Sequence, residues 1–358
     1  MFFYLARFAE YFFPLNVFRY LSFRGIYAAV TTLLLCFLFG GKVIEALKKL
    51  KIRQSIRSDG PPSHLVKSGT PTMGGIFVIG SVVFSVLLWG NFGNRMVWLA
   101  LLAFFAFGIV GFIDDYLKIK RNNSAGLPAW GKLLGQSIIA IGVMMYLYFT
   151  GGSQTTELYL PFLKNPVVNM GFLWIPFGVL LIVGEANAVN ISDGLDGLLA
   201  GLLIFVFIAL AALTYISGRE DFSAYLNIPF ISGAGELTIL CLAVVGALVS
   251  FLWYNTHPAQ VFLGDTGSLS LGGLVAVISL IIKKEVLVLI IGGVFVLEIL
   301  SVVIQVVSFK LRKKRVFLMS PWHHHLELSG WAESKIVVRL WILGGLFALI
   351  ALSTIKIQ

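Results

Sequence analysis

Residues 96–113 read MVWLALLAFFAFGIVGFI, an unbroken apolar run, and Asp114 and Asp115 follow it directly. An α-helix needs about 20 largely apolar residues to cross the roughly 30 Å of hydrocarbon in a bilayer. This stretch therefore predicts a membrane-spanning helix that ends with two carboxylates at one membrane surface.

The composition of the whole chain agrees with this prediction. Of 358 residues, 58% are apolar and 12% are charged, whereas soluble domains carry about 25% charged residues. Mean hydropathy is +0.92. So little polar surface excludes a cytosolic enzyme and a secreted disulfide scaffold. The two cysteines, Cys36 and Cys241, lie in apolar runs and give no disulfide framework.

We expect an all-α, polytopic integral membrane protein that forms one domain over residues 1–358. Residues 1–20 are rich in Phe and Tyr, which predicts an interfacial segment rather than a cleaved signal. About ten transmembrane helices are expected, at residues 22–41, 73–90, 96–113, 133–150, 171–186, 196–216, 236–254, 267–282, 286–309 and 336–355.

The basic residues predict the orientation. The chain has a net charge of +10, and 17 of its Lys and Arg residues lie in the connections after the first, third and ninth segments. Because basic connections stay in the cytoplasm, both termini are predicted to be periplasmic, with Lys283 and Lys284 as a local exception. The expected cytoplasmic catalytic segments are residues 42–72, 114–132, 187–195, 255–266 and 310–335.

Five aspartates and a histidine triplet follow odd-numbered segments and so share the predicted cytoplasmic face. Each element has a structural alternative: helix caps, Asx turns or a polar interfacial cluster. For Asp114 and Asp115 the alternative of a helix cap is weakened, because the C-terminal end of a helix disfavours anions. The residues concerned are Asp114, Asp115, Asp193, Asp196, Asp265, His323, His324 and His325.

Gathering these acids needs a cation or a function. Two carboxylates about 5 Å apart repel by roughly 3 kcal/mol at an effective dielectric near 20. Carboxylate oxygens suit a hard cation, and Mg²⁺ binds one or two carboxylates together with substrate phosphate. Zinc held by the histidines is the weaker alternative, because adjacent residues do not all aim at one ion.

Other residues on this face fit a phosphate-containing substrate. Lys67 precedes Thr72 and the Gly74–Gly75 pair, where a helix N-terminus predicts an anion site, although the glycines also suit close helix packing. Asn187 and Asn190 are suited to the edge of a base or sugar, and Phe262 either stacks on a base or anchors the chain at the membrane interface. Within the predicted helices, Glu298 and Arg339 are either functional or a structural pair.

Five segments carry a resemblance to a known family. They are SGTPTMGG at 68–75, FIDDYLK at 112–118, NAVNISDGLDGL at 187–198, FLGDTGS at 262–268 and HHHLELSGW at 323–331. In this order they resemble the bacterial phospho-N-acetylmuramoyl-pentapeptide transferases, of the polyprenyl-phosphate N-acetylhexosamine-1-phosphate transferase superfamily.

The resemblance implies a reaction in peptidoglycan synthesis at the cytoplasmic face of the bacterial inner membrane. Phospho-MurNAc-pentapeptide passes from UDP-MurNAc-pentapeptide to undecaprenyl phosphate, giving lipid I and UMP, with Mg²⁺ as cofactor and no nucleic acid. Asp265 becomes the principal Mg²⁺ ligand beside Asp114 and Asp115, one of which is the base. The histidine triplet 323–325 meets the donor. Substrate binding is implied for Lys67, Thr72, Lys118, Lys132, Asn187, Asn190, Asp193, Asp196, Asn255, Phe262 and Gln305.

Two other functions remain open at this stage. One is a sister enzyme that transfers N-acetylglucosamine-1-phosphate. The other is an ion-coupled transporter, which predicts acids near the bilayer midplane and inverted repeats. Direct displacement is favoured over a phosphoryl-enzyme, since Mg²⁺ can bridge two phosphates. The sequence leaves the oligomeric state open, a homodimer included.

Overall fold

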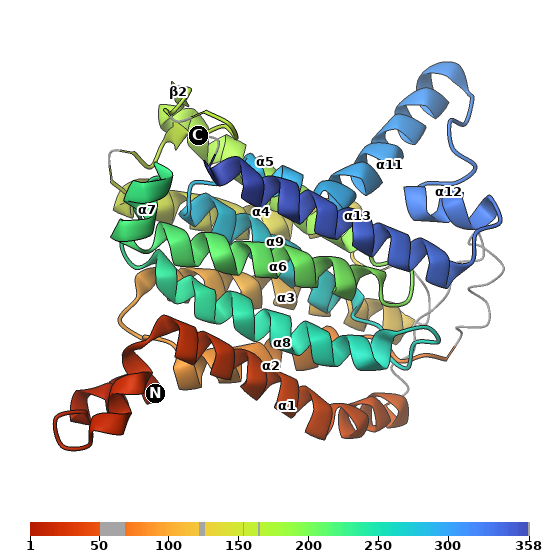
Figure 1. Cartoon of the computed structure of the whole chain (residues 1–358). Helices are drawn as coiled ribbons and strands as arrows, with labels where there is room; N and C mark the ends of the chain where they lie inside the picture. The colour runs from red at the N-terminus through yellow and green to blue at the C-terminus, as the bar shows by residue number, and fades with distance from the viewer. Residues whose placement is uncertain (51–68, 122–125, 153, 164, 357–358) are drawn as a thin grey trace.

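The computed structural model describes residues 1–50, 69–121, 126–152, 154–163 and 165–356, and this part of the chain is almost entirely helical (Figure 1). The long helices are α1 (Leu21–Lys49), α2 (Gly75–Trp89), α3 (Arg95–Arg121), α4 (Ala129–Thr150), α5 (Trp174–Ile191), α6 (Leu198–Ser217), α8 (Leu237–Asn255), α9 (Gly264–Ile281), α11 (Gly293–Arg312) and α13 (Glu333–Ser353).

Shorter elements join them. These are α7 (Glu220–Leu226), α10 (Leu287–Ile291), α12 (Trp322–Leu328), the strands β1 (Glu157–Leu158) and β2 (Val168–Asn169), and the 3₁₀ turns η1 (Phe2–Phe8), η2 (Phe13–Arg19), η4 (Gly171–Leu173), η5 (Ala234–Glu236) and η6 (Thr354–Lys356). The two strands form one small antiparallel hairpin. The hairpin was not predicted.

The prediction of an all-α polytopic membrane protein is confirmed. Among the described residues, nine helices are long and apolar enough to cross a membrane. The expected segment at 73–90 forms α2, which has 15 residues and is shorter than a full span. Both ends of the chain lie at the same end of the bundle (Figure 1).

Several predicted boundaries were wrong. The expected segment at 286–309 is divided at Gly292 into α10 and α11. Helix α3 continues to Arg121, so Asp114 and Asp115 lie inside it and not at its C-terminal end. The expected loop at 187–195 begins as the last turn of α5. Polar residues thus extend regular helices beyond their apolar runs.

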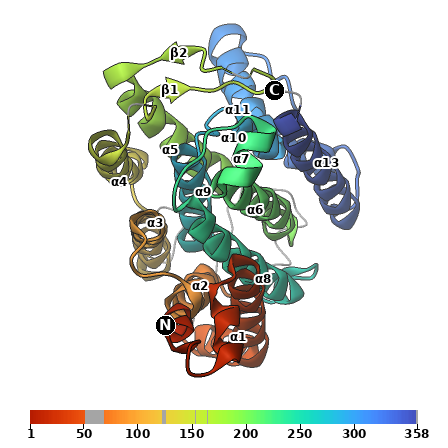
Figure 2. The same ribbon diagram turned by 60° about the vertical axis from the view of Figure 1, so that its left-hand side comes forward.

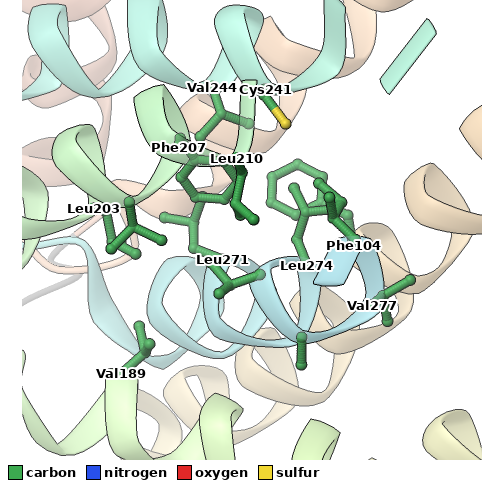
Figure 3. Close-up of a cluster of buried hydrophobic side chains, with 14 of the residues drawn as sticks. Phe104, Val189, Leu203, Phe207, Leu210, Cys241, Val244, Leu271, Leu274 and Val277 are labelled. Atoms are coloured by element: carbon green, nitrogen blue, oxygen red, sulfur yellow. The ribbon is translucent and has the colours of Figure 1, made fainter. Parts of the chain in front are cut away.

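Helix α9 occupies the centre of the bundle and packs against α2, α3, α5 and α6 (Figure 2). Its residues from Thr266 to Ile281 are all buried. Figure 3 shows part of the buried apolar core, to which α3, α5, α6, α8 and α9 contribute the labelled side chains Phe104, Val189, Leu203, Phe207, Leu210, Cys241, Val244, Leu271, Leu274 and Val277. Because lipid is as apolar as leucine, tight packing rather than the hydrophobic effect holds such helices together.

Glycines allow α9 to approach its neighbours closely. A Cβ on Gly111 of α3 would lie 2.1 Å from the carbonyl oxygen of Asp265, and one on Gly75 of α2 would lie 2.3 Å from the backbone nitrogen of Gly267. Only residues without side chains fit between these backbones. The close packing fixes the first turn of α9 against α2 and α3.

Two lysines were an exception to the predicted distribution of basic residues among the connections, and their surroundings explain it. Lys283 and Lys284, in the turn after α9, are buried. The Lys283 Nζ donates to Glu285 Oε1 at 2.6 Å and to the carbonyl of Thr155 at 2.7 Å, and burial lowers the pKa of Lys284 to about 8. These lysines therefore sit in a packed polar cluster with Glu285, and their charges do not face solvent.

A buried ion pair joins α1 to η5, directly before α8, at the end of the bundle that carries the termini. Arg24 is 1% exposed, and its guanidinium binds both oxygens of Glu236 at 2.6 and 2.8 Å. We predict that Glu236→Ala will destabilise the fold by about 3–5 kcal/mol, because it leaves a buried, unpaired guanidinium. Thermal unfolding in detergent will measure this loss.

The exposed pair of Arg219 and Asp221, 2.6 Å apart, provides the control. Asp221→Ala is expected to leave the melting temperature almost unchanged, because solvent screens an exposed pair. Equal losses in the two variants would refute the stabilising role of Arg24 and Glu236.

Candidate active site

Three carboxylates gather where α3 meets the start of α9, at the end of the bundle away from the termini. Oxygens of Asp114, Asp115 and Asp265 lie within 4.8 Å of one another. The structure thus brings Asp265 together with two adjacent acids that lie 150 or more positions earlier in the sequence. Helix α3 supplies two of them, and the third lies in the first turn of α9.

Asp115 anchors the N-terminus of α9. Its carboxylate accepts hydrogen bonds from the backbone N–H of Asp265 at 3.3 Å, the backbone N–H of Thr266 at 3.0 Å and the Thr266 hydroxyl at 2.8 Å. A carboxylate is favoured there by the unpaired N–H groups and the helix dipole. Both oxygens of Asp115 are thereby occupied, and Asp265 is held in place.

Asp114 and Asp265 are the other two acids of the cluster. Asp114 Oδ1 accepts a hydrogen bond from the backbone N–H of Leu127 at 2.7 Å. The Asp265 side chain is 16% exposed, against 4% for each of the other two aspartates. Asp265 is therefore the acid in the cluster that a ligand reaches most directly.

Two lysines neutralise the cluster. The Lys118 Nζ pairs with Asp114 and lies 3.0 Å from Asp265 Oδ2. The Lys132 Nζ approaches the same Asp265 oxygen to 2.7 Å from α4. Lys132 also donates to Asn190 Oδ1 at 3.3 Å. The two ammonium groups offset the repulsion among the acids and leave two further N–H donors for an anion.

Polar contacts between α4, α5 and α9 continue from this cluster into the bundle. Asn190 of α5 donates to Asp265 Oδ1 at 2.9 Å and to the Ser268 hydroxyl at 2.7 Å. About one turn earlier in α5, Asn187 donates a hydrogen bond to Gln136 Oε1 of α4 at 2.6 Å. Sequence reasoning missed Gln136 and Ser268, because a single amide or hydroxyl in an apolar helix is an ordinary feature.

The turn after α5 carries the next two predicted residues. Burial, together with the charges of Asp265 and Asp115, raises the pKa of Asp193 to about 7. Asp196 Oδ2 accepts hydrogen bonds from the backbone N–H of Ala259 and lies 3.1 Å from His257 Nδ1. The turn is therefore part of the same acidic region.

This turn is tied to the 255–262 segment and to α13. Asn255 accepts a hydrogen bond from the backbone N–H of Gly197 at 3.1 Å and donates to the Val261 carbonyl at 2.8 Å. Glu333 accepts from the backbone N–H of Asp196 at 2.9 Å. Glu333 and His257 were missed, since neither lies in a motif and only the tertiary fold brings them to Asp196.

The segment before α2 borders the same region. The backbone N–H of Phe262 donates to the Pro71 carbonyl, and that of Gly74 donates to the Phe262 carbonyl, each at 2.9 Å. The Thr72 hydroxyl lies where a Cβ on Gly264 would approach it to 2.9 Å. Thr72 and Phe262 thus lie beside the start of α9, while Lys67 falls outside the described residues.

The three histidines all lie in α12 but have different environments. His323 is fully buried, whereas His324 and His325 are half-buried. The His324 Nδ1 lies 3.2 Å from Glu327 Oε2, and the His325 Nδ1 accepts from the backbone N–H of Leu318 at 3.2 Å. The triplet is one helical turn with three separate sets of contacts.

Gln305, predicted to bind substrate, contacts the chain that leads to α12. Its amide oxygen accepts from the backbone N–H groups of Val316 and Phe317, each at 3.0 Å, and its nitrogen donates to the Phe317 carbonyl. The suggested pairing of Glu298 with Arg339 was wrong. Glu298 contacts His323, and the Arg339 guanidinium stacks 4.4 Å from the Trp331 ring.

The donor set fits a hard divalent cation. Three aspartates present carboxylate oxygens within one small region, and oxygen ligands of this kind suit Mg²⁺. Lys118 and Lys132 lie in the same region, which matches a substrate that carries phosphate. The arrangement can therefore bind a cation and a phosphate group side by side.

Comparisons with known proteins agree with this chemistry. Residues 97–283 match Glycosyl transferase family 4, and residues 67–79 match the Phospho-N-acetylmuramoyl-pentapeptide-transferase signature 1. A protein of Citrifermentans bemidjiense with the name Phospho-N-acetylmuramoyl-pentapeptide-transferase is 50% identical over 96% of each chain. Proteins of that name from Thermodesulfovibrio yellowstonii and Brachyspira hyodysenteriae are 47% identical over 98% of each chain, and 48% identical over 98% of this chain and 97% of the other. The chain therefore belongs to the phospho-N-acetylmuramoyl-pentapeptide-transferase family.

Proposed function

We propose that this transferase moves phospho-MurNAc-pentapeptide from UDP-MurNAc-pentapeptide to undecaprenyl phosphate, giving lipid I and UMP. The acceptor phosphate oxygen attacks the donor's second phosphorus, and the bond from that phosphorus to the bridging oxygen of UMP breaks. The observation that carries this proposal is the cluster of Asp114, Asp115 and Asp265 with two lysines. Phosphoryl transfer needs such positioning and charge neutralisation more than covalent chemistry.

Mg²⁺ would be held by Asp265 and Asp114. The Asp265 side chain is more exposed than that of Asp114. Both oxygens of Asp115 already accept hydrogen bonds from the start of α9. When bound, the ion neutralises the charge that develops on the transferred phosphoryl group and on the leaving UMP. Asp115 contributes by keeping Asp265 aimed at that position.

The lysines and Asp114 would act on the phosphates directly. Lys118 and Lys132 donate hydrogen bonds to Asp265 Oδ2 in this structure. When the donor is bound, they would turn toward its phosphate oxygens. Asp114 would accept the proton of the acceptor phosphate. The turn at 193–197, together with Thr72, Asn255 and Phe262, would face the uridine side of the donor.

A direct displacement fits this geometry better than a phosphoryl-enzyme. Asp115 is occupied by three donors, and Asp114 is bonded to the Leu127 N–H and Lys118. Asp115 therefore has no free oxygen to attack phosphorus, and Asp114 is assigned in this proposal to the ion and to the proton of the acceptor. The lipid acceptor and the soluble donor would meet where the bundle ends at the cytoplasmic surface of the bacterial inner membrane.

The test is UMP release by the purified protein in detergent. With Mg²⁺, undecaprenyl phosphate and UDP-MurNAc-pentapeptide, we expect UMP and a lipid-linked sugar in equal amounts, and neither product after EDTA treatment. UDP-N-acetylglucosamine is the control donor. Faster turnover of that donor, or a folded protein that makes no lipid-linked product with either donor, would refute the proposal.

A further inference from the structure

Two ionisable side chains lie fully buried between α11 and α12. Glu298 and His323 are each 0% exposed. Glu298 Oε2 is 3.1 Å from His323 Nδ1 and accepts a hydrogen bond from the His323 backbone N–H at 3.4 Å. An ionisable group inside a membrane bundle is costly, so such residues persist only where they are paired or have a role. Neither ring nitrogen of His323 makes a hydrogen bond among the described residues, so the Glu298 carboxylate lies against one edge of the imidazole ring and is held there by the His323 backbone N–H.

The other side of the ring supports the turn after α5. A Cβ added to Gly194 would lie 2.2 Å from His323 Nε2 and 2.9 Å from Cε1. The backbone at Gly194 therefore rests directly on the imidazole, with no space for a side chain between them. Asp193 and Asp196 flank this point of contact.

We propose that Glu298 and His323 are positioning residues that hold the turn 192–197 in place for the donor substrate. Glu298 orients the imidazole ring of His323. The ring in turn sets the position of the Gly194 backbone, and with it the positions of Asp193 and Asp196. The inference rests on the proposed function and deepens it. It gives His323 a role different from the direct donor contact implied by the resemblance, and leaves that contact to His324 and His325, which are half-buried.

The test compares three variants: Glu298→Gln, His323→Ala and Gly194→Ala. Each disturbs the same contact from a different side. We expect each to raise the KM for the UDP-linked donor about tenfold, as a misplaced binding group does. The KM for undecaprenyl phosphate should stay unchanged. Amide hydrogen exchange of residues 192–197 should quicken about tenfold in all three.

The double variant Glu298→Gln/His323→Ala tests the coupling. If Glu298 acts through His323, the double variant should lie within about twofold of His323→Ala alone in donor KM. A product of the two single effects would show independent roles and overturn the proposal. The proposal would also be overturned if His323→Ala were inactive while Glu298→Gln kept wild-type kinetics. That result would mean that the imidazole acts on the donor itself.

Glu285→Gln is the matched control, because Glu285 is also 0% exposed but lies beyond the other end of α9. It should lower the melting temperature without changing donor KM or exchange at 192–197. If Glu298→Gln behaves like Glu285→Gln, the pair is merely structural and the proposal fails. Because hydrogen exchange needs no turnover, it decides the positioning role even if the proposed reaction is wrong.

Discussion

Asp265→Asn will lower turnover at least about a thousandfold while leaving the folded protein in the membrane. The variant keeps the shape of the side chain, but its amide retains only one of the two oxygens that accept from Lys132 and Asn190. It removes the charge on the most exposed acid of the cluster. Losing a cation ligand and its neutralising charge at the reacting phosphate accounts for several kcal/mol of transition-state stabilisation. The measurement is the kcat of UMP release per folded molecule.

The exposed Asp221, which pairs with Arg219 far from the cluster in sequence, supplies the same substitution as a control. Asp221→Asn should retain the wild-type kcat. If Asp265→Asn expresses poorly but its folded fraction turns over normally, Asp265 has a structural role and the proposed metal site is wrong.

Gly111→Ala will inactivate the enzyme although the residue has no side chain to lose. The added Cβ would lie 2.1 Å from the carbonyl oxygen of Asp265 and 2.4 Å from its carbonyl carbon. These are backbone atoms, so the start of α9 must move by about 1 Å to restore an ordinary contact. A displacement of that size at a catalytic centre costs roughly a hundredfold in rate. We expect at least that loss in kcat.

Gly142→Ala is the matched control, since it lies within α4 and a Cβ there meets nothing within 4 Å. Helix propensity alone would stabilise that variant by about 0.5–1 kcal/mol, and its kcat should equal that of the wild type. Equal kcat in Gly111→Ala would show that the close contact between α3 and α9 does not set the position of Asp265.

Much of the fold could be predicted because the membrane imposes a length on each apolar segment. Residues 96–113 and the similar runs correctly gave the order of the long helices. The boundaries could not be predicted in the same way. Helix α3 continues past Asp115 because Lys118 forms an ion pair with Asp114, one helical turn earlier. A hydropathy profile does not detect such local ion pairs.

The candidate site was predictable as far as its residues lie in motifs. Asp114, Asp115 and Asp265 were selected from separate segments, and the structure places them together. Their separate tasks depend on tertiary contacts that the sequence does not contain. Asp115 caps a helix 150 residues away, and the partner of Glu298 proved to be His323 rather than Arg339.

The position of the acids also bears on the transporter alternative. That function predicts carboxylates near the bilayer midplane at broken helices. Here the acids lie in the last two turns of α3 and the first turn of α9. This end-of-bundle position suits a reaction between a lipid and a soluble donor.

The most direct test of the acid cluster as a cation site is Mn²⁺ binding by electron paramagnetic resonance, with Mn²⁺ in place of Mg²⁺. We predict one bound ion per chain in the wild type, displaced by Mg²⁺, and its loss in Asp265→Asn at the same protein concentration. Undiminished binding of the displaceable ion in Asp265→Asn would contradict the account.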